Sequence, residues 1–237
     1  MEFLKTYSQT GYINSLMPKF DDKDINKVVR ILGKEVRKWD VPVINFMAVS
    51  TGDPFKVLIS TVLSLRTKDE TTADASKRLF GKASTPEEIV KLGQKRVAKL
   101  IYPVGFYNVK AKNIINISKK LVSEYNSEVP DDLDELLTFE GVGRKTANLV
   151  ITAGFNKPGI CVDIHVHRIS NRLGYIKTKN PDKTEMVLRE KLPKKHWIDY
   201  NYILVSFGQH LCRPVSPFCS RCPIEKYCMK VGVERTR

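Results

Sequence analysis

The sequence predicts an all-α protein. Hydrophobic residues recur at helical spacing in successive short stretches, and proline and glycine separate these stretches. Strand signals are nearly absent, because no Asn-Gly or Asp-Gly turn lies between alternating runs. The chain has 237 residues, of which 42% are hydrophobic, so it can bury a core as one large domain or two small ones.

The first predicted helix covers residues 25–39. Its apolar positions fall on one helical face: Ile25, Val28, Val29, Leu32, Val36 and Trp39. A loop is expected over 42–54. Residues 55–65 follow and are apolar on most sides, which is typical of a buried core helix.

The next helix start is marked by Thr85-Pro86-Glu87-Glu88, with a hydroxyl N-cap, proline at the first helical position and glutamate at the third. Pro103 and Gly105 interrupt the chain, and a long helix is predicted over 107–125. Apolar periodicity predicts the remaining helices at 131–137, 144–155, 163–173, 183–192 and 199–211.

The net charge is strongly positive, since 40 Lys and Arg against 26 Asp and Glu give +14. Such an excess points to a polyanion, most simply nucleic acid, or to a membrane surface. We expect no membrane span, because no apolar run approaches the required length of about 20 residues, and the first residues do not resemble a secretion signal. The basic residues are also not gathered on one amphipathic helix.

The charge is unevenly distributed. Residues 91–120 hold eight basic residues and no acidic one, whereas residues 121–140 hold seven acidic residues and no basic one. Both stretches can be solvated helix faces. The functional alternative is that 91–120 forms a basic face that meets phosphates.

A glycine turn joins two predicted helices at Gly141-Val142-Gly143. Glycines permit a tight turn and leave backbone N–H groups uncovered at a helix N-terminus, where a phosphate is favoured. The spacing matches neither a Walker loop nor a dinucleotide fingerprint. The alternative is an ordinary corner between two helices.

Two titratable residues follow this turn. Lys145 lies in the first turn of a helix, where the helix dipole disfavours a cation and tends to lower an amine pKa, so it is a candidate nucleophile. The alternative is a solvated lysine. Asp163 is placed to N-cap the next helix, and its carboxylate can also stabilise positive charge at a sugar carbon or assist an amine.

Four of the five cysteines lie near the C-terminus in a C-x6-C-x2-C-x5-C pattern, namely Cys212, Cys219, Cys222 and Cys228. A disulfide framework would spread its cysteines along the chain, so the pattern indicates a metal site in a reducing compartment. One compact, unequal loop favours an iron–sulfur cluster over zinc, which remains the alternative.

Three signatures together resemble the endonuclease III family of DNA glycosylases, which belong to the helix-hairpin-helix superfamily. They are Gly141-Val142-Gly143-Arg144-Lys145-Thr146-Ala147-Asn148, then Val162-Asp163-Ile164-His165, and the cysteine pattern. The resemblance runs from about Asp53 to Cys228.

The resemblance implies a two-domain all-α fold with a DNA-binding cleft between the domains. A six-helix domain would cover 47–157 and contain the helix-hairpin-helix motif at about 131–155. An iron–sulfur domain would combine 1–46 with 158–237 and hold a [4Fe-4S] cluster on Cys212, Cys219, Cys222 and Cys228.

The resemblance also implies an activity. A damaged base would be flipped out of double-stranded DNA. Lys145 would attack the sugar C1′, expel the base and form a Schiff base, after which β-elimination nicks the strand. Asp163 would assist Lys145 or stabilise the charge at C1′. The presence of the lysine favours a bifunctional DNA glycosylase and AP lyase in base excision repair, acting on oxidised pyrimidines and abasic sites.

The implied DNA-binding residues are Gly141, Val142, Gly143, Arg144, Arg66 and Phe106. Arg66 stands where the family often has a glutamine that fills the gap left by the flipped base, and Phe106 stands where it has a leucine-type wedge. Phe139-Glu140 replaces the usual Leu-Pro before the hairpin, so a carboxylate there should weaken DNA contact unless it faces away.

Two other functions remain open. One is a mismatch glycosylase for uracil or thymine opposite guanine, and the other is a non-enzymatic iron–sulfur DNA-binding protein. We expect a monomer that resides inside the cell with the DNA.

Overall fold

The computed structural model describes residues 20–39 and 52–237, and within these ranges all regular secondary structure is helical. The all-α prediction is therefore confirmed for the described part of the chain. No helix there is long and apolar enough to span a bilayer. The first nineteen residues and most of the predicted 42–54 loop lie outside these ranges.

The bounds of the α-helices are α1 Ile25–Glu35, α3 Pro54–Ser64, α4 Asp69–Phe80, α5 Pro86–Leu92, α6 Gln94–Ile101, α7 Tyr107–Glu124, α8 Leu133–Leu137, α9 Arg144–Leu149, α10 Ile164–Leu173, α11 Pro181–Lys191 and α12 Trp197–His210. From α3 to α9 the helices follow one another with short connections.

Side-chain caps fix several of the helix starts. Thr85 and Glu88 form a capping box at α5, as predicted. Asp53 caps α3, with proline at the first helical position, and Asp163 caps α10. Each cap satisfies backbone N–H groups that have no partner inside the helix, so these boundaries are encoded locally.

The prediction differed from the structure at three helices. Two of them, α4 and α6, were not predicted. The buried face of α4 consists mainly of small or polar residues, Thr72, Ala75 and Ser76, with Leu79, so it carries little apolar periodicity. The predicted 144–155 helix is α9 followed by a π-helical turn, Val150–Gly154.

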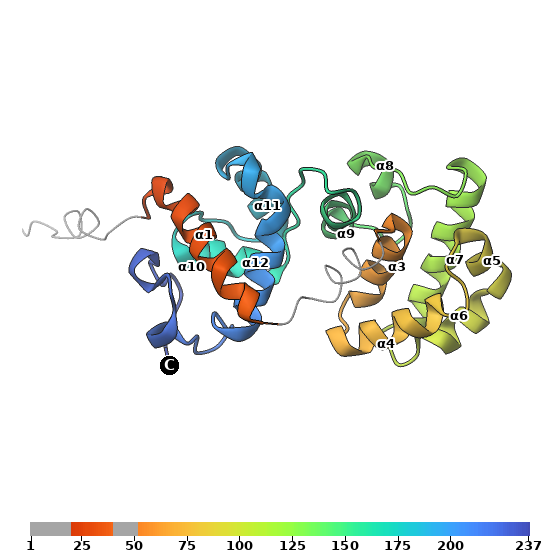
Figure 1. The fold of residues 1–237 in the computed structure, drawn as a ribbon, viewed down its shortest axis with the longest axis horizontal. Coiled ribbons are helices and arrows are strands. Elements are labelled where there is room, and N and C mark those ends of the chain that lie inside the picture. The colour runs from red at the N-terminus through yellow and green to blue at the C-terminus, as the bar shows by residue number, and fades with distance from the viewer. Residues whose placement is uncertain (1–19, 40–51) are drawn as a thin grey trace, which may run out of the picture.

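A first hydrophobic core is built from α3 to α9 and the turn that follows α9. It contains fully buried aliphatic side chains such as Leu58, Leu79, Ile101 and Ile114. These helices form the right-hand group in Figure 1. The segments are consecutive, so this core assembles from one continuous stretch of chain.

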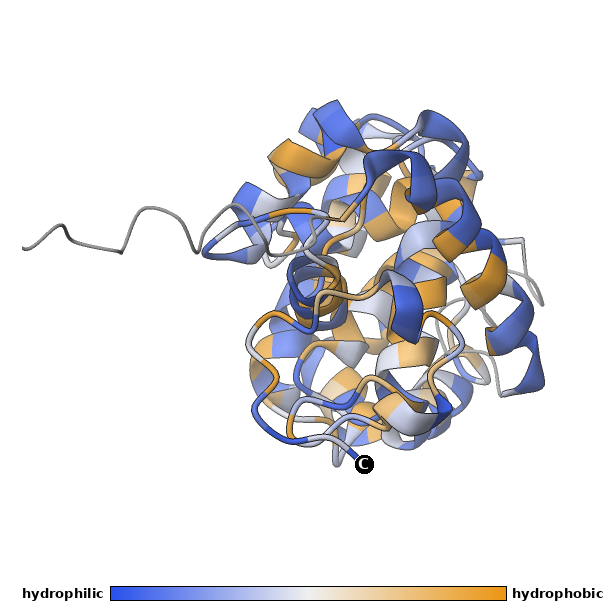
Figure 2. Cartoon of the chain, turned by 90° about the vertical axis from the view of Figure 1, so that its left-hand side faces the viewer, coloured by the Kyte–Doolittle hydropathy of each residue, from blue (hydrophilic) through white to orange (hydrophobic). Residues whose placement is uncertain are grey.

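A second core joins distant parts of the chain. The apolar face of α1, including Val28 and Leu32, packs with residues of α10, α11, α12 and the C-terminal segment. Figure 1 shows α1 in red-orange beside α10 and α12 in cyan and blue. In Figure 2, hydrophilic residues colour much of the outer faces of the peripheral helices, and hydrophobic residues gather between helices.

Candidate functional site

A cleft of about 720 Å³ lies between helices that build the first core and helices that build the second. It is lined by the end of α3, the start of α7, the glycine hairpin and the N-terminal ends of α10 and α11. Six of the predicted site residues line it: Arg66, Phe106, Gly141, Arg144, Lys145 and Asp163. Residues more than one hundred positions apart in the sequence therefore share one concave site, which is where ligands usually bind.

The glycine hairpin joins α8 to α9. Gly141 has φ +80°, a conformation that favours glycine, and a Cβ built on it would lie 2.2 Å from Asn113 Nδ2, so the Asn113 side chain would have to move. A Cβ on Gly143 would meet nothing within 4 Å, so the surface beside Gly143 is open. Val142 is buried in the first core, and only its backbone remains for contact with a ligand.

Phe139 and Glu140 precede the hairpin in place of the Leu-Pro expected there, and each makes specific contacts in the structure. Phe139 is 2% exposed and packs against Tyr125 with ring centroids 5.4 Å apart. Glu140 is exposed and turns to α7, where Asn116 Nδ2 donates to it at 2.6 Å and Lys112 Nζ lies 3.4 Å away. The Asn116 hydrogen bond and the Lys112 charge lower the pKa of Glu140, so it stays ionised with its charge partly compensated.

Lys145 lies in the first turn of α9, and its side chain is exposed. It forms no ion pair within the described residues. Its backbone carbonyl accepts a hydrogen bond from the buried Cys161 thiol at 3.5 Å. Burial raises the pKa of Cys161 to about 12, so this thiol is neutral at physiological pH and is no competing nucleophile.

Asp163 is fixed by the helix that it caps. Its Oδ1 accepts the backbone N–H groups of His165 at 2.8 Å and Val166 at 2.9 Å, which confirms the predicted N-cap. Its Oδ2 accepts no hydrogen bond from the described residues. The carboxylate is thus held in place by one oxygen, and the other remains available in the cleft that Lys145 also lines.

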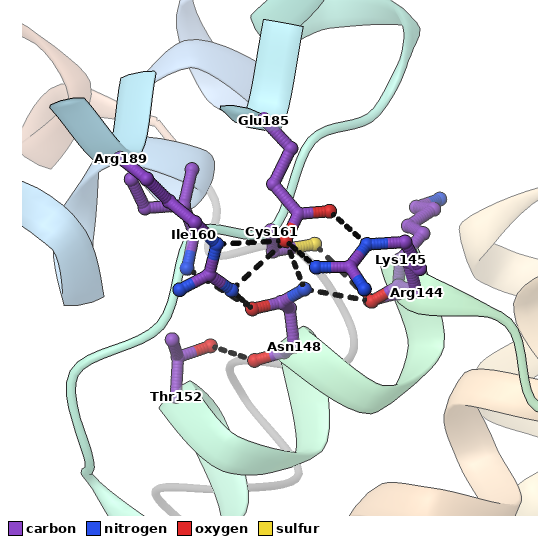
Figure 3. A network of polar contacts seen from close by, with 8 residues as sticks. All are labelled: Arg144, Lys145, Asn148, Thr152, Ile160, Cys161, Glu185 and Arg189. Atoms are coloured by element: carbon purple, nitrogen blue, oxygen red, sulfur yellow. Dashed lines mark hydrogen bonds and ion pairs between the residues drawn. The ribbon is translucent and has the colours of Figure 1, made fainter. Parts of the chain in front are cut away.

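Arg144 is held by a buried carboxylate, as Figure 3 shows. Its Nε donates to Glu185 Oε2 at 2.9 Å and its Nη2 to Oε1 at 2.6 Å. Arg189 Nε and Asn148 Nδ2 also donate to Oε1, at 2.9 and 3.1 Å. Burial raises the pKa of Glu185, but the hydrogen bonds from Arg144 and Arg189 outweigh it, so the pKa lies below its ordinary value.

This network joins the helix of the first core that carries Lys145 to helix α11 of the second. Arg189 Nη2 donates to Asn148 Oδ1 at 2.9 Å, and Ile160 N donates to the same oxygen at 3.2 Å. The sequence prediction missed Glu185, Asn148 and Arg189. Glu185 shares the buried face of α11 with Thr184 and Leu188, and with a single apolar residue on that face no local pattern marks the carboxylate as buried.

Arg66 and Phe106 lie together at the cleft. Both have left-handed backbone conformations, with φ of 53° and 58°. The Arg66 guanidinium lies 5.9 Å from the centre of the Phe106 ring, and 63% of the Phe106 surface is exposed. A large apolar side chain exposed at the rim of a cleft is suited to contact a partner.

The predicted basic face over 91–120 needs one correction. Lys110 is 5% exposed and donates to three protein oxygens, so it is not part of a phosphate-binding surface. Lys112 and Lys120 are engaged with acidic side chains, whereas Lys91, Lys95, Arg96, Lys99 and Lys119 are exposed.

The four C-terminal cysteines line one cavity in the second core, and none forms a disulfide. Arg172 is 8% exposed beside them, and its Nη1 donates to Cys212 Sγ at 3.5 Å and to the Arg213 carbonyl at 2.6 Å. Lys230 N donates to Cys228 Sγ at 3.4 Å. The pKa of Cys222 is raised to about 12, mainly by burial. The nearby sulfurs of Cys228, Cys212 and Cys219 raise it further.

Comparisons with known proteins agree with this arrangement. Residues 59–194 match the family described as "HhH-GPD superfamily base excision DNA repair protein". The chain is 50% identical to endonuclease III of Thermotoga maritima over 176 residues, which cover 74% of this chain and 83% of that protein. It is 38% identical to endonuclease III of Bacillus subtilis over 177 residues, covering 74% and 81%.

Solved structures show the same likeness. A trapped endonuclease III–DNA covalent intermediate is 33% identical with a TM-score of 0.79, covering 88% of this chain and 95% of that one. A thermostable thymine-DNA glycosylase is 25% identical with a TM-score of 0.77, covering 87% and 96%.

Proposed function

Because the chain belongs to the HhH-GPD superfamily of base excision DNA repair proteins and covers more than four fifths of the two bacterial endonuclease III relatives above, we propose that it acts as a bifunctional DNA glycosylase and AP lyase. It is a base excision repair enzyme that binds DNA. The observation that carries the assignment is the presence of Lys145 and Asp163 in one cleft, beside the hairpin and the exposed Phe106.

Lys145 is proposed as the nucleophile. Its neutral amine forms a bond to C1′ of the damaged nucleotide as the bond between C1′ and the base breaks. The nitrogen then loses a proton, and the bond between C1′ and O4′ breaks while O4′ takes up a proton, which gives the protonated Schiff base. This Schiff base makes the C2′ proton acidic, and loss of that proton expels the 3′ phosphate. Lys145 is suited to this role because it is exposed and not tied up in an ion pair among the described residues.

Asp163 is proposed to support both stages. Its Oδ1 is committed to the α10 backbone, so the carboxylate cannot swing away. Its Oδ2 can accept a proton from the Lys145 ammonium or stabilise the positive charge that develops at C1′. A carboxylate preorganised in this way needs no reorientation during the reaction.

The proposed DNA contacts surround this pair. The backbone of Gly141, Val142 and Gly143 faces a phosphate, and Arg66 and Phe106 enter the space that the flipped nucleotide leaves. Arg144 contributes indirectly, because its guanidinium is engaged by Glu185. The substrates are oxidised pyrimidines and abasic sites in duplex DNA, and the protein acts as a monomer wherever the DNA resides in the cell.

We propose a [4Fe-4S] cluster on Cys212, Cys219, Cys222 and Cys228. An all-thiolate donor set in one cavity, with N–H donors aimed at two of the sulfurs, fits this group. The cluster would fasten the C-terminal segment. Two domains are proposed around the two cores: 47–157, and 1–46 together with 158–237.

Borohydride trapping tests the proposal. Duplex DNA with an abasic site is incubated with the protein and sodium borohydride, and a covalent complex is expected on a denaturing gel. Lys145→Ala should abolish the complex, and Lys34→Ala, which removes an exposed lysine of α1, should not. Trapping by Lys145→Ala at the parent level would refute the assignment of the nucleophile.

A mismatch glycosylase is the second candidate, favoured by the likeness to the thymine-DNA glycosylase. Release of thymine glycol, compared with release of thymine from a G·T mismatch, distinguishes the two. We expect thymine glycol release with strand nicking. Release from the mismatch alone, without nicking, would support the second candidate, and DNA binding without release from either duplex would support a non-enzymatic protein.

A further inference from the structure

The turn that carries Arg66 and the turn that carries Phe106 are in direct contact. A Cβ built on Gly105 would lie 2.9 Å from the Arg66 carbonyl oxygen, so only glycine allows the two backbones to approach this closely. Gly105 N also donates to Thr67 Oγ1 at 3.3 Å. Gly105 therefore contacts the backbone of Arg66 and the side chain of Thr67, and we call this contact between the two turns the joint.

Lys110 completes this joint from the first turn of α7. Its Nζ donates to the carbonyl oxygens of Leu63 at 2.7 Å and Leu65 at 2.5 Å, and to Thr67 Oγ1 at 3.0 Å. The Leu63 and Leu65 carbonyls lie at the C-terminal end of α3, where carbonyls lack partners within the helix and a cation is favoured. One side chain thus connects α7 to the segment that displays Arg66.

The burial of Lys110 is costly, which makes a purely packing role a poor explanation. The side chain is 5% exposed and has no carboxylate partner among the described residues. Burial lowers the pKa of Lys110 to about 8, so the protonated form still dominates at neutral pH. Only that form offers three N–H donors to three oxygens.

The backbones on either side of the joint are also unusual. Arg66 and Phe106 both lie in the left-handed region, which is a strained conformation for a residue other than glycine. Such conformations persist only where surrounding contacts fix them. The contacts of Lys110, Thr67 and Gly105 supply that constraint.

We propose that Lys110 is a positioning residue that holds the Arg66 and Phe106 turns as one preformed element, so that both side chains enter the duplex together. This inference rests on the proposed function, because it assumes that these two side chains occupy the space left by the flipped nucleotide. Lys110 acts through them and does not touch the reacting atoms. Without it, each turn is free to relax before DNA binds, and affinity for distorted DNA falls.

The test uses DNA that binds but cannot react. The duplex carries a tetrahydrofuran abasic analogue with 2-aminopurine opposite, and insertion of Arg66 and Phe106 unstacks the 2-aminopurine and raises its fluorescence. Lys110→Met keeps the length of the side chain but removes the ammonium. We expect at least about a fivefold loss of affinity and a smaller fluorescence rise, whereas Lys34→Met should match the parent.

A double-mutant cycle separates positioning from general loss of stability. In an Arg66→Ala background, Lys110→Met should cost much less affinity than in the parent, because the side chain that it positions is already absent. Additive losses in the cycle, or a parent-like fluorescence response in Lys110→Met, would overturn the proposal.

Thr67→Val provides a second variant if Lys110→Met does not fold. It removes the oxygen that joins Gly105 and Lys110 but leaves both carbonyl contacts of Lys110. A partial loss of affinity and fluorescence response is expected, and no loss would count against the joint. If the parent fails to trap abasic DNA yet responds with 2-aminopurine, the proposed lyase is wrong and the positioning role stands. If the parent gives no 2-aminopurine response, the positioning role is wrong.

Discussion

Arg144 and Glu185 form a two-point ion pair between α9 and α11, with donor–acceptor distances of 2.9 and 2.6 Å. The Glu185 side chain is 4% exposed and also accepts from Arg189. Removing one member of such a group leaves buried charge without compensation. Because α9 also carries Lys145, the pair links the two hydrophobic cores directly beside the proposed nucleophile.

Replacing Glu185 should therefore destabilise the protein. For Glu185→Ala we expect a loss of about 3 kcal/mol, because Arg144 and Arg189 are left facing each other. The melting temperature, followed by circular dichroism, should fall by about 5–10 °C. Glu190→Ala is the matched control, since it removes an exposed glutamate of the same helix and should melt with the parent. A parent-like melting temperature for Glu185→Ala would contradict the role given to this pair.

The same pair should make stability depend on acid. The pKa of Glu185 is below its ordinary value in the folded protein, so as the pH falls the unfolded chain takes up its proton first. The stabilisation is complete above the unfolded pKa of about 4.3 and is lost as the pH falls through the lower folded value. The difference in melting temperature between the parent and Glu185→Gln should shrink as the pH falls from about 5 to about 3. A constant difference would show that the Glu185 charge is not involved.

The two hairpin glycines should respond differently to alanine. Gly141→Ala forces a side chain into a positive φ and against Asn113, and we expect a loss of about 1–2 kcal/mol in the free energy of unfolding. Gly143→Ala meets no atom within 4 Å, so the free energy of unfolding should change by less than about 0.5 kcal/mol.

Gly143→Ala should affect DNA binding although it leaves stability unchanged. If a phosphate lies against the hairpin, the methyl group of Gly143→Ala should weaken binding to the tetrahydrofuran duplex although the protein is fully stable. Titrations by fluorescence anisotropy measure this effect. Unchanged affinity in Gly143→Ala would place the phosphate elsewhere.

Glu140 should oppose DNA binding in a salt-dependent way. Glu140→Gln removes a carboxylate beside the hairpin and frees Lys112 to face a phosphate, so affinity for undamaged duplex should rise about two- to threefold at low salt. The gain should disappear at high salt because exposed charges are screened. Glu35→Gln is the control, because it breaks the pair that Glu35, the last residue of α1, forms with Lys38. An equal gain in both variants would mean that only net charge matters.

Arg172 should be required to retain the proposed iron–sulfur cluster. Its guanidinium donates to Cys212 Sγ and to the Arg213 and Pro214 carbonyls, which fixes the loop that starts at the first cysteine. Arg172→Gln should lower the ratio of absorbance at about 400 nm to absorbance at 280 nm to less than about half of the parent value. Arg30→Gln, at an exposed position of α1, should retain the parent ratio. Metal analysis that finds zinc in the parent would contradict the iron–sulfur assignment itself.

Helix boundaries could be predicted from the sequence wherever a short segment determines its own structure. The helix starts at Thr85 and Asp163 were predicted from a few neighbouring residues, and both caps are confirmed. Helix α4 was missed because Thr72, Ala75 and Ser76 bury a face without an apolar signal. Lys110 was assigned to a basic surface, since its three oxygen acceptors come from a segment more than forty positions earlier.

In the candidate site too, residues in a local sequence pattern could be predicted, and residues brought together only by the tertiary structure could not. Lys145 and Asp163 could be selected because each lies in a recognisable local pattern, and the structure places both in one cleft. Glu185 could not be selected in this way. Its partners Arg144 and Asn148 lie on another helix, and a carboxylate in a helical stretch looks solvated until the tertiary structure shows that it is buried.

The division of the second core between α1 and the C-terminal third of the chain has a consequence during synthesis. The first core can form as soon as α3 to α9 have left the ribosome, because its contacts are local. Helix α1 is made before them, yet α12, against which it packs, begins only at Trp197. Its apolar face therefore cannot reach its native partner until most of the chain has been translated, so the second core forms after the first.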